Sequence, residues 1–179
     1  MATNKNLPEK PTTSRVGRSN QRYNPETGAR MVAGCVCLNE EKTKVIMISS
    51  SVHLGKWVLP KGGIELDEGN DFVVSAVRET WEEAGCEGTI VQKLPVVLDT
   101  RGKKAPLPPQ GVEFDPKKII PKSEFHFYEM NVLELSKDWP EKVQRLRRWC
   151  TYAEAKHELE KAKRPELLQA LELSNIVRN

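Results

Sequence analysis

The stretch of sequence that decides the fold is GGIELDEGNDFVVSAVRETWEEAGC, which runs from Gly62 to Cys86. Asn70 and Asp71 are residue types that cap the start of a helix, and an apolar periodicity follows them. Gly85 suits the left-handed backbone position that ends many helices. The pattern therefore predicts a helix that continues to about Ala84.

The two sides of this predicted helix differ in chemistry. With about 100° between successive side chains, one side forms an apolar stripe. The stripe consists of Val73, Val74, Val77, Trp81 and Ala84. Glu79, Glu82 and Glu83 fall on the opposite side, at the i, i+3 and i+4 spacing that brings carboxylates within reach of one another. Because like charges repel, this side is expected either to be well solvated or to hold a hard cation such as Mg²⁺.

Charge is distributed unevenly along the chain. Residues 1–20 carry a net charge of +3, and the other 159 residues are neutral overall. The sequence pI of about 8.6 thus gives little indication of nucleic-acid binding. Residues 62–88 carry −7, while basic clusters lie at 101–104, 117–122 and 142–148. This separation predicts a cleft where metal cations and a polyanion meet; the alternative is an acidic helix beside an ordinary surface.

Length and composition narrow the class of protein. A chain of 179 residues has room for one ordinary domain and a tail. It has no apolar run of membrane-spanning length and no signal-peptide core, so we expect neither secretion nor membrane insertion. Cys35 and Cys37 alternate on one predicted strand, and the four cysteines lack a zinc-binding spacing. Reduced thiols in a protein of the cytoplasm or the nucleus are the expectation.

The chain divides into an arm and a domain. Residues 1–20 are polar and predict a disordered basic arm, and residues 21–179 predict the folded domain. Residues 99–123 hold five prolines and several lysines, which indicates an insertion or loop. Predicted strands lie at 31–38, 44–50, 57–60, 89–97, 124–132 and 148–150. Further helices are predicted from the Thr151 capping box to about Ala162 and from Pro165 onward, so we expect a sheet covered by helices.

The quoted stretch resembles the Nudix box. Residues 78–86 match its second half, REUxEExGU with U apolar, although nine residues separate Glu68 from Arg78 where the pattern has seven. We interpret the difference as a loop two residues longer. Other segments resemble the diadenosine and diphosphoinositol polyphosphate phosphohydrolases, specifically a fungal member. These segments are 27–37, 49–51, 56–63, 124–128 and 162–168.

The resemblance implies a fold and a catalytic apparatus. The fold is α+β: a Nudix α/β/α sandwich with a mixed β-sheet and a catalytic loop-helix-loop. Glu79, Glu82 and Glu83 would hold Mg²⁺, with Mn²⁺ as a substitute, and Glu83 would position or deprotonate the attacking water. Arg78 would orient a box glutamate through a salt bridge. The implied reaction is metal-assisted attack of water on a phosphoanhydride phosphorus.

The resemblance also implies a cationic substrate site. A phosphate-rich substrate requires positively charged side chains and backbone donors. Family positions correspond here to Arg22, Arg30 and Ser50, and Gly62 and Gly63 would let backbone amides approach a phosphate. Further candidates, chosen by charge and by their place near matching segments, are Lys56, Lys61, Lys122 and Arg147. The alternative for each basic residue is an ordinary exposed surface charge.

The expected substrates are diphosphoinositol polyphosphates and diadenosine polyphosphates, with inorganic polyphosphate as a further candidate. One alternative is a pyrophosphohydrolase that acts on mRNA caps or nucleotides and selects the base. Another is a non-catalytic polyphosphate sensor. We expect small polyanions as partners, no membrane and no stable nucleic-acid partner, and a monomer.

Overall fold

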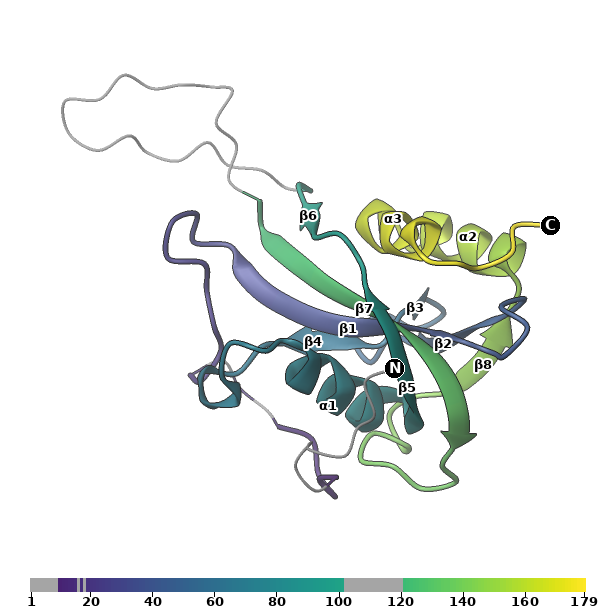
Figure 1. The fold of residues 1–179 in the computed structure, drawn as a ribbon, viewed down its shortest axis with the longest axis horizontal. Coiled ribbons are helices and arrows are strands. Elements are labelled where there is room, and N and C mark those ends of the chain that lie inside the picture. The colour runs from purple at the N-terminus through teal and green to yellow at the C-terminus, as the bar shows by residue number, and fades with distance from the viewer. Residues whose placement is uncertain (1–9, 16, 18, 102–120) are drawn as a thin grey trace.

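A computed structural model of the protein describes residues 10–15, 17, 19–101 and 121–179 (Figure 1). Across these residues eight strands form one sheet. The strands are β1 (Arg30–Leu38), β2 (Val45–Ser49), β3 (Trp57–Val58), β4 (Lys61–Gly63), β5 (Cys86–Lys93), β6 (Val97–Asp99), β7 (Ser123–Leu135) and β8 (Arg147–Cys150). The main order is β3-β2-β1-β7-β5, while β4 pairs with β1, β6 with β7 and β8 with β2. Because β1 and β7 are parallel and the other pairs antiparallel, the sheet is mixed, as predicted.

Helices cover both faces of this sheet (Figure 1). Helix α1 (Val73–Ala84) lies on one face, against β1, β4 and β5. On the other face lie α2 (Tyr152–Lys161) and α3 (Pro165–Leu173), which also pack against each other. The predicted α/β/α sandwich is confirmed. In the part of the chain that the structure describes, no helix is long and apolar enough to span a membrane.

Strand β1 is the centre of the core. Every residue of β1 after Arg30 is buried, because β1 has neighbouring strands on both edges and helices over both faces. Cys35 and Cys37 are both buried in it as free thiols. Burial raises the pKa of the Cys35 thiol to about 12, so this side chain behaves as a small apolar group.

The structure corrects several predicted boundaries. The predicted strand 57–60 ends at Val58, and the predicted strand 89–97 is divided between β5 and β6. Pro60 and Pro95 lie at the two interruptions, and proline has no N–H to donate to a sheet ladder. The short strand β4 follows the first interruption and pairs with β1 at Ala33↔Gly62.

The predicted helix ends are largely confirmed. Gly85 has φ 62°, in the left-handed region, and closes α1 as predicted. The start differs, since the cap position is Phe72 rather than Asn70 or Asp71. The Asp71 carboxylate still accepts a hydrogen bond from the Val73 N–H, at 3.3 Å. The Thr151 capping box of α2 and the Pro165 start of α3 are both present.

The arm over 1–20 and the insertion over 99–123 stay predictions, since residues 1–9, 16, 18 and 102–120 lie outside the described residues. The described part of the arm contacts the domain. Trp81 Nε1 donates to the Pro11 carbonyl at 2.9 Å, and the Arg15 guanidinium pairs with Asp67 at 2.9 Å. These residues therefore lie along α1 and the loop that precedes it.

Candidate active site

The glutamate side of α1 is the buried side. Glu79, Glu82 and Glu83 are 8%, 1% and 7% exposed, whereas Val73 and Val77 on the opposite side are only half-buried. The interpretation of the glutamates as a solvated acidic face is therefore wrong. Helix α1 points its charged side at the sheet, which requires compensating charge inside the protein.

Arg78 supplies much of that charge. Its Nε and Nη2 both donate to the Glu68 carboxylate at 2.8 Å, and Nη2 also donates to the Gly63 carbonyl at 3.0 Å. Its Nη1 donates to Glu79 Oε1 at 2.8 Å and to Glu82 Oε2 at 3.0 Å. The predicted salt bridge from Arg78 to a box glutamate is thus present. The longer loop still returns Glu68 to Arg78, through a 3-10 turn at Leu66–Glu68.

Two of the three predicted metal ligands face a cavity, and one does not. Glu79 and Glu83 line a lobe of about 430 Å³, together with Gly62, Gly63 and Glu141. Glu82 lies outside this lobe and uses both oxygens elsewhere. Its Oε2 accepts from Arg78, and its Oε1 accepts from the Arg15 backbone N–H at 3.2 Å. The structure thus brings Glu79 and Glu83 together and turns Glu82 away from them.

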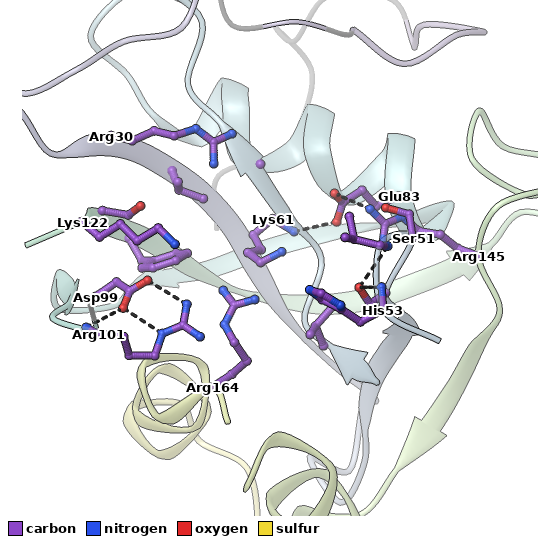
Figure 2. Close-up of a pocket in the computed structure, with 17 residues that line it drawn as sticks. Arg30, Ser51, His53, Lys61, Glu83, Asp99, Arg101, Lys122, Arg145 and Arg164 are labelled. Carbon is purple, nitrogen blue, oxygen red and sulfur yellow. Dashed lines mark hydrogen bonds and ion pairs between the residues drawn. The ribbon is translucent and has the colours of Figure 1, made fainter. Parts of the chain in front are cut away.

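A larger cavity of about 610 Å³ adjoins this lobe and shares Glu83 and Gly62 with it (Figure 2). Its lining is rich in basic residues, contributed by strands of the sheet and by loops around it. They are Arg30, Lys61, Arg101, Lys122, Arg145 and Arg164. Figure 2 shows them spread around the space beside Glu83. A strongly cationic wall therefore faces the carboxylates.

Most of the predicted substrate residues lie around these spaces. The large cavity contains Arg30, Ser50, Lys61, Gly62 and Lys122 in its lining. An adjoining space of about 240 Å³ contains Lys56, and the lobe beside Glu79 contains Gly63.

Arg22 and Arg147 are placed differently, outside the linings of these three spaces. Arg22 donates to Asn70 Oδ1 at 2.9 Å and to the Gly69 carbonyl at 3.0 Å. Arg147 donates to the Ala84 carbonyl at 2.8 Å, at the carboxyl end of α1, where a cation is favourable. The structure thus assigns both arginines contacts that hold the backbone around α1.

Sequence reasoning missed several lining residues. Arg145 and Glu141 come from the loop between β7 and β8, Arg101 follows β6, and Arg164 lies between α2 and α3. Arg101 and Arg145 belong to basic clusters that are visible in the sequence. The clusters alone could not show which members point into the cavity.

Comparisons with known proteins show the family of this chain. Residues 28–171 match the family model described as the NUDIX domain. The chain belongs to the Nudix family. It is a Nudix hydrolase, a class of enzyme that generally uses divalent metals such as Mg²⁺.

Named relatives cover most of this Nudix hydrolase. It is 35% identical over 170 residues to Nudix hydrolase 16, mitochondrial, of Arabidopsis thaliana, which covers 88% of this chain and 85% of the relative. It is 31% identical over 136 residues to diphosphoinositol polyphosphate phosphohydrolase 3-alpha of Homo sapiens, covering 74% of this chain and 70% of the relative. The match to Nudix hydrolase 21, chloroplastic, of Arabidopsis thaliana is 33% identical over 147 residues, covers 79% of this chain and spans only 65% of that relative.

A solved structure shares the fold. The NUDIX hydrolase from Nitrosomonas europaea superposes with a TM-score of 0.60 at 14% identity, covering 80% of this chain and 86% of that chain. At this identity the likeness supports the Nudix fold alone.

Burial dominates the electrostatics of the Nudix site. Burial, and next the neighbouring Glu83 carboxylate, raises the pKa of Glu79 to about 8. Burial likewise raises the pKa of Glu83 and lowers the pKa of the Lys61 ammonium. Each shift reflects the cost of holding a charge away from water. The two carboxylates thus carry more buried negative charge than their partners fully offset.

This donor set fits a hard divalent cation. Among the described residues no group of three or more His, Cys, Asp or Glu side chains stands ready to hold a metal ion. The reason is visible in the contacts, because Glu82 is turned toward Arg78. Glu79 and Glu83 nevertheless supply carboxylate oxygens to one lobe, and Mg²⁺ needs only one or two carboxylates when phosphate and water complete its shell. These two residues are therefore the ones that would hold the ion.

Gly62 is required for the close approach of β4 to this pair. A Cβ atom at Gly62 would overlap the Glu79 carboxylate. We expect Gly62→Ala to displace that carboxylate, to weaken divalent-ion binding, and to lower kcat by about 10²-fold. Calorimetric titration with Mg²⁺ and steady-state kinetics would measure both effects.

Gly88→Ala is the matched control. A Cβ there would overlap the Asn131 carbonyl oxygen of β7, away from the cavity. It should lower the melting temperature and leave Mg²⁺ affinity unchanged. Equal Mg²⁺ affinity for Gly62→Ala and the wild type would contradict the proposed place of Glu79.

Proposed function

We propose that this Nudix hydrolase is a metal-dependent phosphoanhydride hydrolase of small, densely phosphorylated molecules. Its ion is Mg²⁺, with Mn²⁺ as a substitute. Its substrates are diphosphoinositol polyphosphates and diadenosine polyphosphates, with inorganic polyphosphate as a further candidate. The observation that carries the proposal is a set of basic side chains in and beside the cavity, near Glu79 and Glu83, with N–H groups that no described carboxylate accepts.

Some cavity cations are already neutralised within the protein. Arg101 binds the Asp99 carboxylate through Nε and Nη2, both at 2.9 Å. Arg145 pairs with Glu83 at 3.1 Å and with Glu141 at 2.9 Å. A phosphate would have to break these ion pairs to bind the same nitrogens, so these two arginines favour a positioning role.

Other cavity cations are available. Within the described residues, the ammonium groups of Lys56, Lys61 and Lys122 donate no hydrogen bond, although that of Lys61 interacts through space with Glu83 and Glu79. Arg164 binds Glu166 through Nε, and its two terminal nitrogens make no hydrogen bond to a described residue. Those terminal nitrogens can form the two parallel hydrogen bonds that suit a phosphate. Lys61, Lys122 and Arg164 line the large cavity and Lys56 lines the space that adjoins it, so the four fit a ligand with several phosphates better than one with a single phosphate.

The protein's own groups can direct the reaction. Glu83 Oε2 accepts from the Lys61 backbone N–H at 3.0 Å, which fixes the carboxylate next to β4. From there Glu83 orients a water toward the phosphorus, and Lys61 lies close enough to neutralise the phosphoryl oxygens. The water oxygen bonds to phosphorus as its proton passes to the Glu83 carboxylate and the bridging P–O bond breaks, and the leaving phosphate departs toward the basic wall. Bound Mg²⁺ would supply activation of that water and stabilisation of the developing charge.

The cavity favours an enzyme that accepts different head groups over one that selects a particular nucleotide base. Phe125 lies in the cavity lining but is 3% exposed, so it offers little ring surface for stacking a base. A cap or nucleotide pyrophosphohydrolase would need such a contact for selectivity. Glu79 and Glu83 favour a catalytic site over a non-catalytic polyphosphate sensor, because a sensor would not need a pair of carboxylates beside its basic residues. The name of the human relative, diphosphoinositol polyphosphate phosphohydrolase 3-alpha, points to the same substrate class.

A substrate panel tests this function. The wild-type protein with Mg²⁺ would be given a diphosphoinositol polyphosphate, diadenosine hexaphosphate, inorganic polyphosphate and capped RNA. We expect the highest kcat/KM for the first two, loss of activity with EDTA, and recovery with Mg²⁺ or Mn²⁺. Preference for capped RNA, or strong selection among bases, would replace the proposal with the nucleotide alternative.

A second prediction concerns the contribution of the available cations to substrate binding. Lys122→Gln and Arg164→Gln should each raise KM for a diphosphoinositol polyphosphate about tenfold, because each removes a charge-assisted hydrogen bond. Their kcat values should change less than their KM values. Lys156→Gln, on the exposed side of α2, is the control and should keep the wild-type KM. Unchanged KM in both cavity variants would show that substrate binds elsewhere.

A further inference from the structure

A continuous series of hydrogen bonds joins Glu83 to the loop between β7 and β8. Arg145 Nη2 donates to Glu83 Oε1 at 3.1 Å, and Arg145 Nε donates to Glu141 Oε1 at 2.9 Å. Arg145 Nη1 donates to the Ser49 carbonyl at 2.9 Å. The other oxygen of Glu141 accepts from Ser14 Oγ at 2.7 Å. The Arg145 side chain is 8% exposed, so it makes these contacts largely out of water.

We propose that Arg145 is a positioning residue for Glu83 and that Glu141 sets how strongly Arg145 holds it. In the metal-free protein Arg145 is the hydrogen-bonded counter-ion that orients Glu83 beside Glu79, and Lys61 adds positive charge nearby. Glu83 would be the ligand that a divalent cation and Arg145 both require, and Glu141 would weaken the hold of Arg145 by pairing with its guanidinium. This inference rests on the proposed function, because it concerns the same carboxylate.

The division of counter-ions among the box glutamates supports this role. Arg78 pairs with Glu68, Glu79 and Glu82, and none of these three ion pairs reaches Glu83. Among the described residues, Arg145 is the one side chain that forms an ion pair with Glu83. A buried carboxylate without a cation is costly. The Lys61 ammonium also acts on Glu83, but through space. The cation that is hydrogen-bonded to this carboxylate is Arg145, more than sixty positions away in the chain.

The loop that carries Arg145 is fixed at both sides of the site. The Glu141 backbone N–H donates to the Glu82 carbonyl at 3.0 Å, which ties the loop to α1. Ser49 and Leu146 exchange two hydrogen bonds, of 2.9 and 2.8 Å, which tie it to the end of β2. The guanidinium is therefore held between α1 and β2, as a positioning role requires.

The proposal predicts opposite changes in divalent-ion affinity for substitutions of Arg145 and of Glu141. Arg145→Met removes the competing cation from Glu83 Oε1, so divalent-ion affinity should rise about tenfold. The same change releases the orientation of Glu83, so kcat should fall about 10²-fold, with a smaller change in KM. Glu141→Gln leaves Arg145 with Glu83 as its one charged partner, so divalent-ion affinity should fall about threefold.

Calorimetric titration of metal-free protein with Mg²⁺ and with Mn²⁺, without substrate, is the deciding measurement. Arg145→Lys should recover most of the wild-type affinity, because it restores the charge. Arg148→Met is the matched control: Arg148 is an exposed arginine on β8 that pairs with Glu158, and its loss should leave divalent-ion affinity unchanged.

Weaker divalent-ion binding in Arg145→Met would overturn the proposal, and loss of binding in Glu141→Gln would show Glu141 to be a ligand rather than a partner of Arg145. Unchanged affinity in both variants would reduce the hydrogen-bond series to a structural contact. A failure of the proposed function looks different. In that case the wild type would hydrolyse none of the panel substrates, while the affinities of the variants would still differ in the predicted directions.

Discussion

Glu83→Gln should lower kcat by about 10²–10⁴-fold, the range that a positioned acid–base group contributes. The amide keeps the shape of the carboxylate but has no negative charge with which to hold a cation or polarise a water. Burial already raises the pKa of Glu83, so a neutral side chain is tolerated at this position. We therefore expect the variant to fold normally. Steady-state kinetics with Mg²⁺ would measure the loss, and circular dichroism with urea unfolding would establish the fold.

Glu87→Gln is the matched control for that variant. Glu87 belongs to the same acidic segment but pairs with Lys10 and lies outside the cavity linings. It should keep wild-type turnover. Near-wild-type turnover in Glu83→Gln would reject the proposed role and would shift attention to Glu79 as the residue that orients the water.

The sequence predicted those parts of the fold that depend on local chemistry. Apolar runs identified β1 and β2, and the residue types at Thr151 and Gly85 identified two helix ends. The parallel pairing of β1 with β7 could not be predicted from local patterns, because its partners are more than ninety positions apart. That pairing rests on the packing of the whole sheet. The α/β/α sandwich was predicted from the family resemblance rather than from periodicity.

The sequence predicted the identity of the key glutamates but not their surroundings. A helical periodicity assigns the apolar stripe of α1 to the interior, yet Glu82 is 1% exposed. The difference arises from Arg78, which lies on the same helix and neutralises the acids beside it. Hydrophobic periodicity counts charged residues as exposed and carries no information on how they pair inside a protein.

The basic residues also show that a sequence does not reveal where charged side chains point. Arg145 and Arg147 are two positions apart in one basic cluster, and the sequence favoured Arg147 for the substrate site. The structure places Arg145 in the cavity, while Arg147 binds main-chain carbonyls at the end of α1. Arg147 begins β8, whereas Arg145 lies in the loop before it. Charge in a sequence gives the number of cations but not their orientation.

Arg78→Met should produce a large loss of stability, about 3–5 kcal/mol in the free energy of unfolding. Arg78 forms ion pairs with Glu68, Glu79 and Glu82 through side chains that are nearly all buried. Methionine fills a similar volume but leaves three carboxylates without that cation. Urea unfolding of the metal-free protein would measure the change. Arg78→Lys should recover only part of it, because an ammonium cannot reproduce the two parallel bonds to Glu68.

The control for Arg78 is an arginine whose ion pair lies in water. Arg178 pairs with Glu172 at 3.7 Å, and its side chain is 51% exposed. Arg178→Met should change the free energy of unfolding by less than about 1 kcal/mol, as exposed ion pairs do. A wild-type unfolding midpoint in Arg78→Met would mean that the three carboxylates bear no net charge in the folded protein. The site would then lack the buried negative charge that makes it attractive to a divalent cation.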